Sequence, residues 1–447
     1  MRDVLVIGGG PAGSACAYWL ADAGWDVVVV EKKQFPREKT CGDGLTPRAV
    51  RQIADMGLEG ELSGAHKFGG LRAHGWGHVL EMEWPAHPVF PSYGYTITRH
   101  DLDALVAERA AKAGAEVLQG TEAVEPLVVD GGATGGHHTG ANGKANANAN
   151  ANGLGPDHDD DRLLPYCAGA VVKNKSGETR EIRARYVVVA DGSNSRIGRA
   201  LGAGRRKGYP LGMALRGYYR SARHDDPYIE SHLDIRDAAG EAVPGYGWIF
   251  PLGDGRVNVG VGLLSTDQRW KGLNTSKLME TFVAQAPASW GLTPESSCGP
   301  PTGGKLPMSM AVGPHYGPNV LLAGDAGGSI NPFNGEGIAY GYETGRLAAV
   351  HVGRALAGEG PAGIEAYGRH LEDAYGPYYR VGRAFVRLIS NPEAMRRCVS
   401  LGMRSERLMM ELLRIMANLM RPERPGAAEV GYDLMIEIAR MLPEEVL

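Results

Sequence analysis

The opening segment, Met1–Glu31, constrains the fold of this chain more than any other stretch. An apolar run at Val4–Ile7 predicts a buried parallel strand and leads directly into the glycine motif Gly8–Gly13. An alanine-rich helical segment follows, and a second apolar strand at Asp26–Val30 ends at Glu31. Glycine alone is weak evidence, because 65 of the 447 residues are glycine. The order of strand, glycines, helix, strand and acid nevertheless predicts a dinucleotide-binding βαβ unit.

Each residue of this motif has a physical role in such a unit. Gly8 permits the tight turn, Gly10 lets the backbone approach a pyrophosphate, and Gly13 lets the helix pack closely on the sheet. The N-terminus of the helix offers free N–H groups and a partial positive charge to the pyrophosphate. Glu31 stands where an acid can accept hydrogen bonds from ribose hydroxyls. The alternative is an ordinary βαβ turn without a ligand.

The composition indicates a globular protein of two or three domains, with 43% apolar and 22% charged residues. The net charge of −4 gives no basic field, so we expect no nucleic-acid partner. The five cysteines are widely spaced and form no CxxC pair. This pattern favours reduced thiols over a disulfide framework or a zinc site, and we expect no metal.

The sequence also indicates where the protein resides. The first strand begins so early that no room is left for a signal peptide. No stretch of about 18 uncharged apolar residues is present, which argues against a membrane-spanning helix. We therefore expect a cytoplasmic protein.

A low-complexity segment at about 131–161 interrupts the chain, and alanine alternates with asparagine from Ala145 to Asn152. Few of its residues can build a core, so we expect this insertion to be disordered. Strand-like flanks at Glu116–Leu118 and Gly169–Lys175 predict that it lies at a hairpin tip, where insertions are tolerated.

Two further apolar strands lead into aspartate. Tyr186–Ala190 precedes Asp191, and Val320–Ala323 precedes Gly324 and Asp325. A carboxylate directly after a buried strand lies at the carboxyl end of that strand, where open α/β sheets bind ligands. For each aspartate the alternative is a role as a helix cap or turn residue.

Four motifs occur in the order found in the flavoprotein monooxygenase superfamily, and the chain resembles that superfamily. They are Gly8–Gly13, an arginine before a helix at Arg99, Ala190–Gly202 and Ala323–Gly337. The resemblance implies the fold of the aromatic hydroxylases and FAD as the cofactor.

The resemblance also implies roles for individual residues. Gly8, Gly10, Gly13 and Glu31 would hold the ADP half of FAD, and Arg99 would contact the cofactor. Asp191 would lie near the pyrophosphate, Asp325 would bond the ribityl chain, and Asn334 to Gly337 would line the isoalloxazine. The full expected set is Gly8, Gly10, Pro11, Ala12, Gly13, Glu31, Cys41, Gly42, Arg99, Asp191, Gly324, Asp325, Pro332, Asn334, Gly335 and Gly337.

The expected fold is an α/β protein with three interleaved regions. Strand-like runs between about Gly208 and Met310 predict an antiparallel sheet that forms one wall of a pocket, and the tail from about Glu365 is helical. We expect an FAD-binding domain at 1–75, 98–206 and 315–364, a substrate-binding sheet domain at 76–97 and 207–314, and a helical region at 365–447.

A narrower resemblance is to the geranylgeranyl reductase family, whose members reduce carbon–carbon double bonds in polyprenyl chains. It is carried by FPREKTCGDGLTPRAV at Phe35–Val50 and PGYGWIFPLGDGRVNVGVG at Pro244–Gly262. The resemblance is greatest to actinobacterial members that act on menaquinone, and it covers the chain apart from the insertion. It implies a polyprenyl lipid or quinone as the substrate.

Saturation of an isolated alkene requires a hydride, a proton donor and a dry apolar pocket. Cys41, flanked by Gly42 and Gly44, is a candidate donor beside the flavin, because a thiol with a pKa of about 8.5 is mostly protonated at neutral pH. Tyr246 is the next candidate. The alternative for Cys41 is a small buried residue without a chemical role.

Tyr246, Trp248 and Phe250 alternate along one strand and so share one face, which predicts an apolar wall for a prenyl chain. Pro251 follows them and completes the expected substrate-binding group. The alternative is an ordinary sheet core.

Other functions remain open at this stage. A monooxygenase, such as a prenyl epoxidase or hydroxylase, shares every FAD motif, and a flavin halogenase or a quinone-binding flavoprotein without turnover are further alternatives. No second glycine motif with strand and helix flanks is present, so electrons would come from NAD(P)H bound transiently or from another reduced carrier.

Near the C-terminus, polar residues recur at helical spacing opposite an apolar face. The polar stripe comprises Arg404, Arg407, Glu411, Arg414, Asn418 and Arg421. A basic amphipathic helix suits peripheral contact with the inner face of a membrane, and it equally suits packing against the protein's own core.

Overall fold

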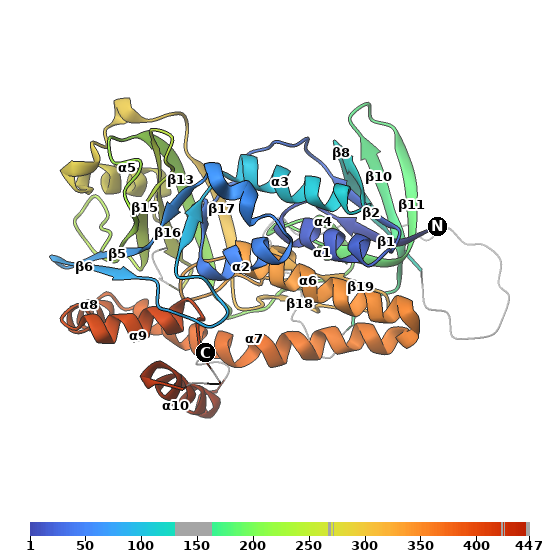
Figure 1. The fold of residues 1–447 in the computed structure, drawn as a ribbon. Coiled ribbons are helices and arrows are strands. Elements are labelled where there is room, and N and C mark those ends of the chain that lie inside the picture. Colours follow the sequence, from blue (N-terminus) through green and yellow to red (C-terminus); the bar gives the residue numbers. More distant parts are fainter. Residues whose placement is uncertain (130–162, 267–269, 271, 422, 424, 444–447) are drawn as a thin grey trace.

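Two seven-stranded sheets dominate the described part of the chain, and helices run between and below them (Figure 1). The computed structural model describes residues 1–129, 163–266, 270, 272–421, 423 and 425–443. The expected insertion at 131–161 therefore lies outside the described residues.

The first sheet has the strand order β8-β2-β1-β11-β10-β9, and β19 also pairs with β11. β8, β2, β1, β11 and β19 are parallel, whereas β9, β10 and β11 pair antiparallel. The strands are β1 (Arg2–Ile7), β2 (Val27–Glu31), β8 (Glu116–Gln119), β9 (Thr121–Val128), β10 (Cys167–Asn174), β11 (Thr179–Val189) and β19 (Val320–Leu322). Every residue of β2 is buried, as expected for a parallel strand covered on both faces.

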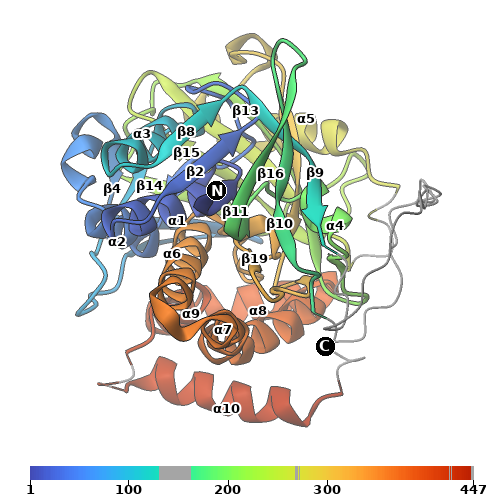
Figure 2. The same cartoon turned by 90° about the vertical axis from the view of Figure 1, so that its right-hand side faces the viewer.

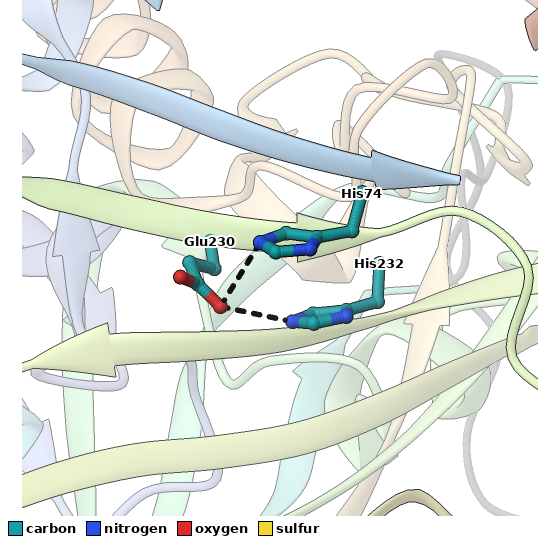
Figure 3. Close-up of side chains that lie close together, drawn as sticks. All are labelled: His74, Glu230 and His232. Atoms are coloured by element: carbon teal, nitrogen blue, oxygen red, sulfur yellow. Dashed lines mark hydrogen bonds and ion pairs between the residues drawn. The ribbon is translucent and has the colours of Figure 1, made fainter. Parts of the chain in front are cut away.

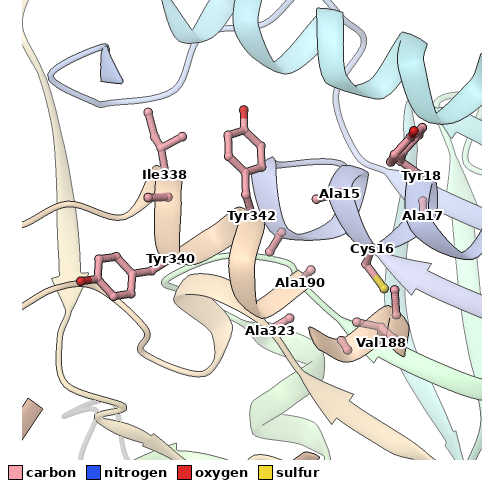
Figure 4. Packing of buried hydrophobic residues seen from close by; sticks show 14 of the residues in the cluster. Ala15, Cys16, Ala17, Tyr18, Val188, Ala190, Ala323, Ile338, Tyr340 and Tyr342 are labelled. Carbon is pink, nitrogen blue, oxygen red and sulfur yellow. The ribbon is translucent and has the colours of Figure 1, made fainter. Parts of the chain in front are cut away.

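Helices α1 (Pro11–Asp22) and α6 (Ile338–Arg354) pack directly against each other beside this sheet. Figure 4 shows their apolar side chains gathered near the strand ends that carry Val188, Ala190 and Ala323. The approach is close: a Cβ added to Gly345 would lie 2.2 Å from the carbonyl oxygen of Ala12. Helices α3 (Arg99–Lys112) and α4 (Arg196–Ala200) complete this part of the fold.

The second sheet has the order β17-β13-β16-β15-β14-β5-β6 and is antiparallel except for the parallel pair β14 and β5. The strands are β5 (Gly70–Gly75), β6 (His78–Glu83), β13 (Leu211–Arg220), β14 (Tyr228–His232), β15 (Gly245–Pro251), β16 (Arg256–Leu264) and β17 (Thr302–Pro307). Helix α5 (Thr275–Gln285) packs on β13 and β16. This helix was not predicted, because it lies within a stretch of strand-like runs.

Short elements connect these layers. They are β3 (Gly44–Leu45), β4 (His66–Phe68) and β7 (Gly94–Thr96), which form a three-stranded sheet, β12 (Gly204–Arg205) and β18 (Val312–Gly313), which pair together, and α2 (Pro47–Asp55).

The C-terminal region is helical, as expected. It comprises α7 (Pro361–Ile389), α8 (Pro392–Gly402), α9 (Glu406–Met416) and α10 (Ala427–Met441). α7 runs beneath α6, and α10 lies on the outer side of α7 (Figure 2).

The predicted arginine stripe is wrong in part. Helix α9 ends at Met416, and Asn418 has a φ of +53°, so the stripe does not continue along one helix. Arg414 is buried, and its guanidinium donates to the carbonyl oxygens of Ala86 and Leu419, each at 3.4 Å.

The expected α/β architecture with an interleaved antiparallel sheet and a helical C-terminus is confirmed. The domain boundaries remain a prediction, and β5, within the expected segment 1–75, pairs in the second sheet. The strand directly before the insertion is β9, whereas the predicted Glu116–Leu118 strand is β8 and pairs with β2. No helix of the described residues is long and apolar enough to span a bilayer.

Candidate active site

A cavity of about 880 Å³ lies where the glycine motif, the second sheet and the C-terminal helices meet. Most of the predicted site residues line it: Gly8, Gly10, Pro11, Ala12, Glu31, Cys41, Gly42, Arg99, Asp191, Tyr246, Trp248, Phe250, Gly324, Asp325, Pro332, Asn334, Gly335 and Gly337. Of the predicted set within the described chain, Gly13 and Pro251 lie outside this lining. Segments far apart in the sequence thus meet around one space.

The glycines of the N-terminal motif have different environments. Gly8 has a φ of +102°, and a Cβ there would lie 2.4 Å from the carbonyl oxygen of Ala190. A Cβ on Gly13 would lie 1.8 Å from the carbonyl oxygen of Gly8, so this glycine serves the packing of α1 on the sheet. Gly10 is different, because the nearest atom to an added Cβ is Nη2 of Arg37 at 3.8 Å. Gly10 is the N-cap of α1 and lines the cavity, so the first N–H groups of α1 suit an anion there.

Glu31 is buried at the end of β2, and backbone N–H groups fix its carboxylate. Oε2 accepts from Gly9 at 3.0 Å and Oε1 from Lys33 at 2.9 Å. Nη2 of Arg37 lies 3.4 Å from Oε2, and Nη1 of Arg37 lies 3.0 Å from Asp103. Arg37 lines the cavity but was not predicted, because a single arginine in a charged loop has no distinguishing pattern.

Arg99 begins α3 and is held rigidly at the cavity wall. Its guanidinium donates two hydrogen bonds to Asp103, at 2.6 and 2.7 Å. Its backbone N–H donates to Oδ1 of Asp43 at 3.2 Å. The expected contact between Arg99 and FAD remains a prediction.

Asp191 has the capping role that the sequence left open, whereas its expected place near the pyrophosphate remains a prediction. Its Oδ2 accepts from the backbone N–H groups of Arg196 and Ile197, at 2.9 and 3.2 Å, at the start of α4. Its Oδ1 is buried without a hydrogen-bond partner among the described residues. Burial raises the pKa of this carboxyl. Asp325 follows β19 and lies 3.5 Å from Nζ of Lys39.

The Cys41–Gly44 loop is anchored by Asp43, which is fully buried with a φ of +63°. Its Oδ2 accepts hydrogen bonds from the hydroxyl of Tyr218 at 2.6 Å and from Nδ2 of Asn258 at 2.8 Å. Burial raises the pKa of Asp43 to about 6, and these hydrogen bonds oppose the rise. Asp43 therefore ties the loop to β13 and β16.

Cys41 lies at the cavity end of this anchored loop, and its carbonyl oxygen accepts from Nδ2 of Asn258 at 2.8 Å. Burial raises the pKa of the Cys41 thiol, so the thiol stays protonated at neutral pH. Cβ atoms added to Gly42 and Gly44 would lie 3.1 and 3.3 Å from the ring of Phe250. The two glycines therefore allow the loop to rest on the aromatic strand.

The aromatic residues of β15 face the cavity together, as their alternation predicted. The hydroxyl of Tyr246 donates to the carbonyl oxygen of Asn334 at 2.7 Å, and Nε1 of Trp248 donates to Asn258 at 2.9 Å. Gly260 leaves room for the indole, because a Cβ there would lie 2.1 Å from the ring. The side chain of Pro251 is buried outside the cavity lining, and its carbonyl oxygen accepts from the hydroxyl of Thr96.

Beyond the aromatic wall the cavity is lined by aliphatic, methionine and aromatic side chains from both the sheet and the C-terminal helices. They include Leu71, Met82, Trp84, Ile229, Leu233, Leu263, Met308, Phe333, Phe385, Ile389, Met395, Met409, Leu413 and Met416. Such a lining favours an extended apolar ligand.

Glu336 also lines the cavity, and it was predicted only as part of the range Asn334 to Gly337, not as a site residue of its own. It lies in the same Asn-Gly-Glu-Gly stretch as the predicted Asn334, Gly335 and Gly337, and an acid among those glycines was the available signal. The hydroxyl of Thr46 donates to its Oε1. Burial raises the pKa of Glu336 to about 7.

His74, Glu230 and His232 form a compact cluster (Figure 3). Ala73 and Ser231, their neighbours on β5 and β14, line the cavity, so the cluster lies on the opposite face of these strands. The Nε2 atoms of His74 and His232 lie 3.4 and 3.1 Å from Oε2 of Glu230. Arg72 and Trp290 also donate to this carboxylate, each at 2.8 Å. Because Arg72 and Trp290 already donate hydrogen bonds to Glu230, we interpret the cluster as support for the cavity wall, and the absence of a metal remains a prediction.

The residues present fit a dinucleotide cofactor. The N-terminus of α1 suits a pyrophosphate, the buried Oδ1 of Asp191 lacks a partner in the described structure, and Glu31 ends β2 where ribose hydroxyls are expected. Fold and site together define a dinucleotide-binding α/β protein whose cofactor site adjoins an apolar cavity.

Comparison with known proteins agrees. Residues 1–147 match the family described as "FAD binding domain". The chain is 39% identical over 418 residues to the menaquinone reductase of Mycobacterium tuberculosis, covering 93% of this chain and 91% of that protein. It is 30% identical over 353 residues to digeranylgeranylglycerophospholipid reductase 1 of Methanopyrus kandleri, covering 77% of this chain and 79% of that protein. The chain belongs to the geranylgeranyl reductase-like family of FAD-dependent oxidoreductases.

Solved structures share the fold. A geranylgeranyl bacteriochlorophyll reductase-like protein from Thermoplasma acidophilum superposes with a TM-score of 0.73 at 21% identity, covering 97% of this chain and 99% of that one. A flavin-dependent brominase superposes with a TM-score of 0.70 at 18% identity, covering 99% and 100%. The aromatic-hydroxylase type of FAD fold is thereby confirmed.

Proposed function

We propose that this protein reduces carbon–carbon double bonds of a polyprenyl chain, with the menaquinone side chain as the favoured substrate and a geranylgeranyl group as the alternative. The observation that carries the proposal is the continuous cavity. It is lined both by the glycine motif and Asp325 and by apolar side chains such as Met409 and Leu413. One space thus suits both a cofactor and a long hydrocarbon.

Bound and reduced FAD would supply a hydride. The protein must then hold the alkene in a dry apolar pocket and provide a proton. The aromatic wall of Tyr246, Trp248 and Phe250 would hold the prenyl chain and exclude water from the alkene. Cys41, placed on a loop anchored by Asp43, would contact the reacting end. Electrons would reach the cofactor from NAD(P)H or another reduced carrier.

The test is an anaerobic single turnover. Photoreduced protein is mixed with a menaquinone or a geranylgeranyl lipid, and the product is analysed by mass spectrometry. We expect flavin oxidation together with a gain of two hydrogens in the side chain. A product that forms only with oxygen would instead identify a monooxygenase, such as a prenyl epoxidase or hydroxylase.

A Cys41→Ala variant examines the reacting end in the same assay. We expect normal flavin content, because no hydrogen bond joins Cys41 to the glycine motif in the described structure. Turnover should be slower, because Cys41 lines the cavity where the alkene would react. Wild-type turnover by this variant would remove Cys41 from the catalytic group.

We further propose peripheral membrane contact through the corner between α8 and α9. Leu401 and Leu408 are 66% and 41% exposed there, beside the exposed Arg404 and Arg407. The same two helices contribute cavity residues, including Met395 of α8 and Met409, Leu413 and Met416 of α9. An isoprenoid drawn from a bilayer would have a short path between this surface and the cavity.

A further inference from the structure

Glu336 has a free carboxyl oxygen in a place where a charge is costly. Glu336 is only partly exposed, and it is one of the residues that line the cavity. The hydroxyl of Thr46, the N-cap residue of α2, donates to Oε1. Oε2 is buried and has no hydrogen-bond partner within the described chain. Such an oxygen is more stable when protonated, because an ionised carboxylate would lack solvation.

The charges around Glu336 are arranged so that they do not neutralise it. Arg48 of α2 is the nearby cation, but it is bound to Glu343 of α6, with Nη2 and Nε at 3.0 and 2.9 Å from the two carboxylate oxygens. Burial raises the pKa of Glu336, Arg48 opposes the rise and Glu343 adds to it. The phenols of Tyr340 on α6 and Tyr246 on β15 are the other titratable groups near this carboxyl.

The other acidic groups near Glu336 are weaker acids or already donate their proton to a hydrogen bond. The hydroxyl of Tyr246 donates to the carbonyl oxygen of Asn334, so its proton already has an acceptor. Burial raises the pKa of the Cys41 thiol above its ordinary value. A general acid is most effective when its pKa is close to the working pH, which favours Glu336 over either group. Tyr246 lies near both, since a charge on Cys41 or on Glu336 would raise the pKa of its phenol.

We propose that Glu336 is the catalytic acid that protonates the prenyl alkene. The proposal rests on the proposed function, because it needs an alkene in the cavity. One alkene carbon receives the hydride, and the π bond breaks as that C–H bond forms. The other carbon takes the proton from the Glu336 carboxyl, whose O–H electron pair stays on oxygen. The carboxylate then regains a proton from water, so each turnover consumes one hydride and one proton.

The first test needs no turnover. The flavin-loaded protein is titrated by infrared difference spectroscopy, and wild type is compared with Glu336→Gln. We expect a protonated-carboxyl band that titrates near pH 7 in wild type and is missing in the variant. Glu38→Gln is the matched control, because Glu38 lines the same cavity but is 56% exposed and paired with Arg216. A Glu336 carboxyl that is already ionised at pH 5 overturns the proposal.

The second test is the anaerobic single turnover across pH. We expect the wild-type rate to fall above about pH 7, and Glu336→Gln to be slower by roughly 10²–10⁴-fold with normal flavin content. Cys41→Ala should keep this fall in rate near pH 7. Glu343→Gln should move the fall to lower pH, because Glu343 raises the pKa of Glu336. A Glu336→Gln variant that keeps the wild-type rate and the same pH dependence overturns the assignment of Glu336 as the catalytic acid. Absence of wild-type turnover overturns the proposed function. The infrared titration is independent of turnover, so it still shows whether the Glu336 carboxyl is protonated at neutral pH.

Discussion

At the scale of single residues, the glycines of the N-terminal motif predict different mutant phenotypes. Gly10→Val should fold, because no atom lies within 3.8 Å of an added Cβ, yet its side chain would project where the pyrophosphate is expected. Gly13→Ala should fail to fold stably, since its Cβ would lie 1.8 Å from the Gly8 carbonyl oxygen. Flavin absorbance and circular dichroism of the purified variants check both. Full flavin content in folded Gly10→Val would show that the cofactor is placed wrongly.

Glu336 also predicts a stability effect that depends on pH. Its pKa is raised from 4.5 to about 7, so the folded state binds more protons than the unfolded state between those values, and wild-type stability falls as the pH rises through 7. Glu336→Gln cannot ionise at this position, so its free energy of unfolding should not show this decrease. The variant should gain on the order of 3 kcal/mol relative to wild type between pH 4.5 and pH 8. Denaturant unfolding at the two pH values measures the difference, and an equal offset at both would contradict it.

The sequence predicted those site residues whose role is local. The glycine motif, Glu31 and the alternating aromatic strand depend on spacing alone. Asp43 depends on Tyr218 and Asn258, which are 175 and 215 positions away, and such partners leave no periodic signal. The raised pKa of Glu336 likewise arises from burial among α2, α6 and β15, which only the tertiary structure brings about.

At the scale of elements, the packing of α1 on α6 predicts a sharp difference between two helical glycines. Gly345→Ala would place a Cβ 2.2 Å from the carbonyl oxygen of Ala12, so the helices must separate. The expected loss is about 1–3 kcal/mol or more. Gly431 of α10 has no atom within 4 Å of an added Cβ, and Gly431→Ala should stabilise the helix by up to about 1 kcal/mol. Thermal unfolding of both variants checks the pair, and equal effects would contradict the close packing.

Elements were predictable where burial alone dictates the pattern. Apolar runs identified β1, β2, β11 and β19, because parallel strands covered on both faces are continuously apolar. Helix α5 was missed because it lies within a stretch of strand-like runs. The end of α9 at Met416 was missed because the apolar and polar spacing continues past it, although Asn418 adopts a left-handed conformation.

At the scale of the whole molecule, the cavity is assembled from parts that no single segment contains. Its lining runs from Ile7 in β1 to Ala417 after α9, so the apolar end depends on the C-terminal helices. Those helices also form the outer surface at the α8–α9 corner. Lipid access and catalysis are therefore expected to depend on the same region of the fold.

This arrangement predicts salt-sensitive binding to anionic vesicles through Arg404 and Arg407, which are exposed beside Leu401 and Leu408. Binding should weaken at high salt, because charges are screened over about 8–10 Å near physiological ionic strength. The double variant Arg404→Glu with Arg407→Glu should lose most of the binding while keeping its flavin, as measured by vesicle co-sedimentation.

The matched control is charge reversal of two exposed arginines on β11, Arg180 and Arg183, at the far end of the molecule from α8 and α9 (Figure 1). If the corner is the contact surface, this control should bind vesicles as wild type does, because reversing the same number of charges there leaves the corner intact. Equal losses in the two double variants would show that only net charge matters. No binding of wild type to anionic vesicles at low salt would contradict membrane contact, and the exposed Leu401 and Leu408 would then require another explanation.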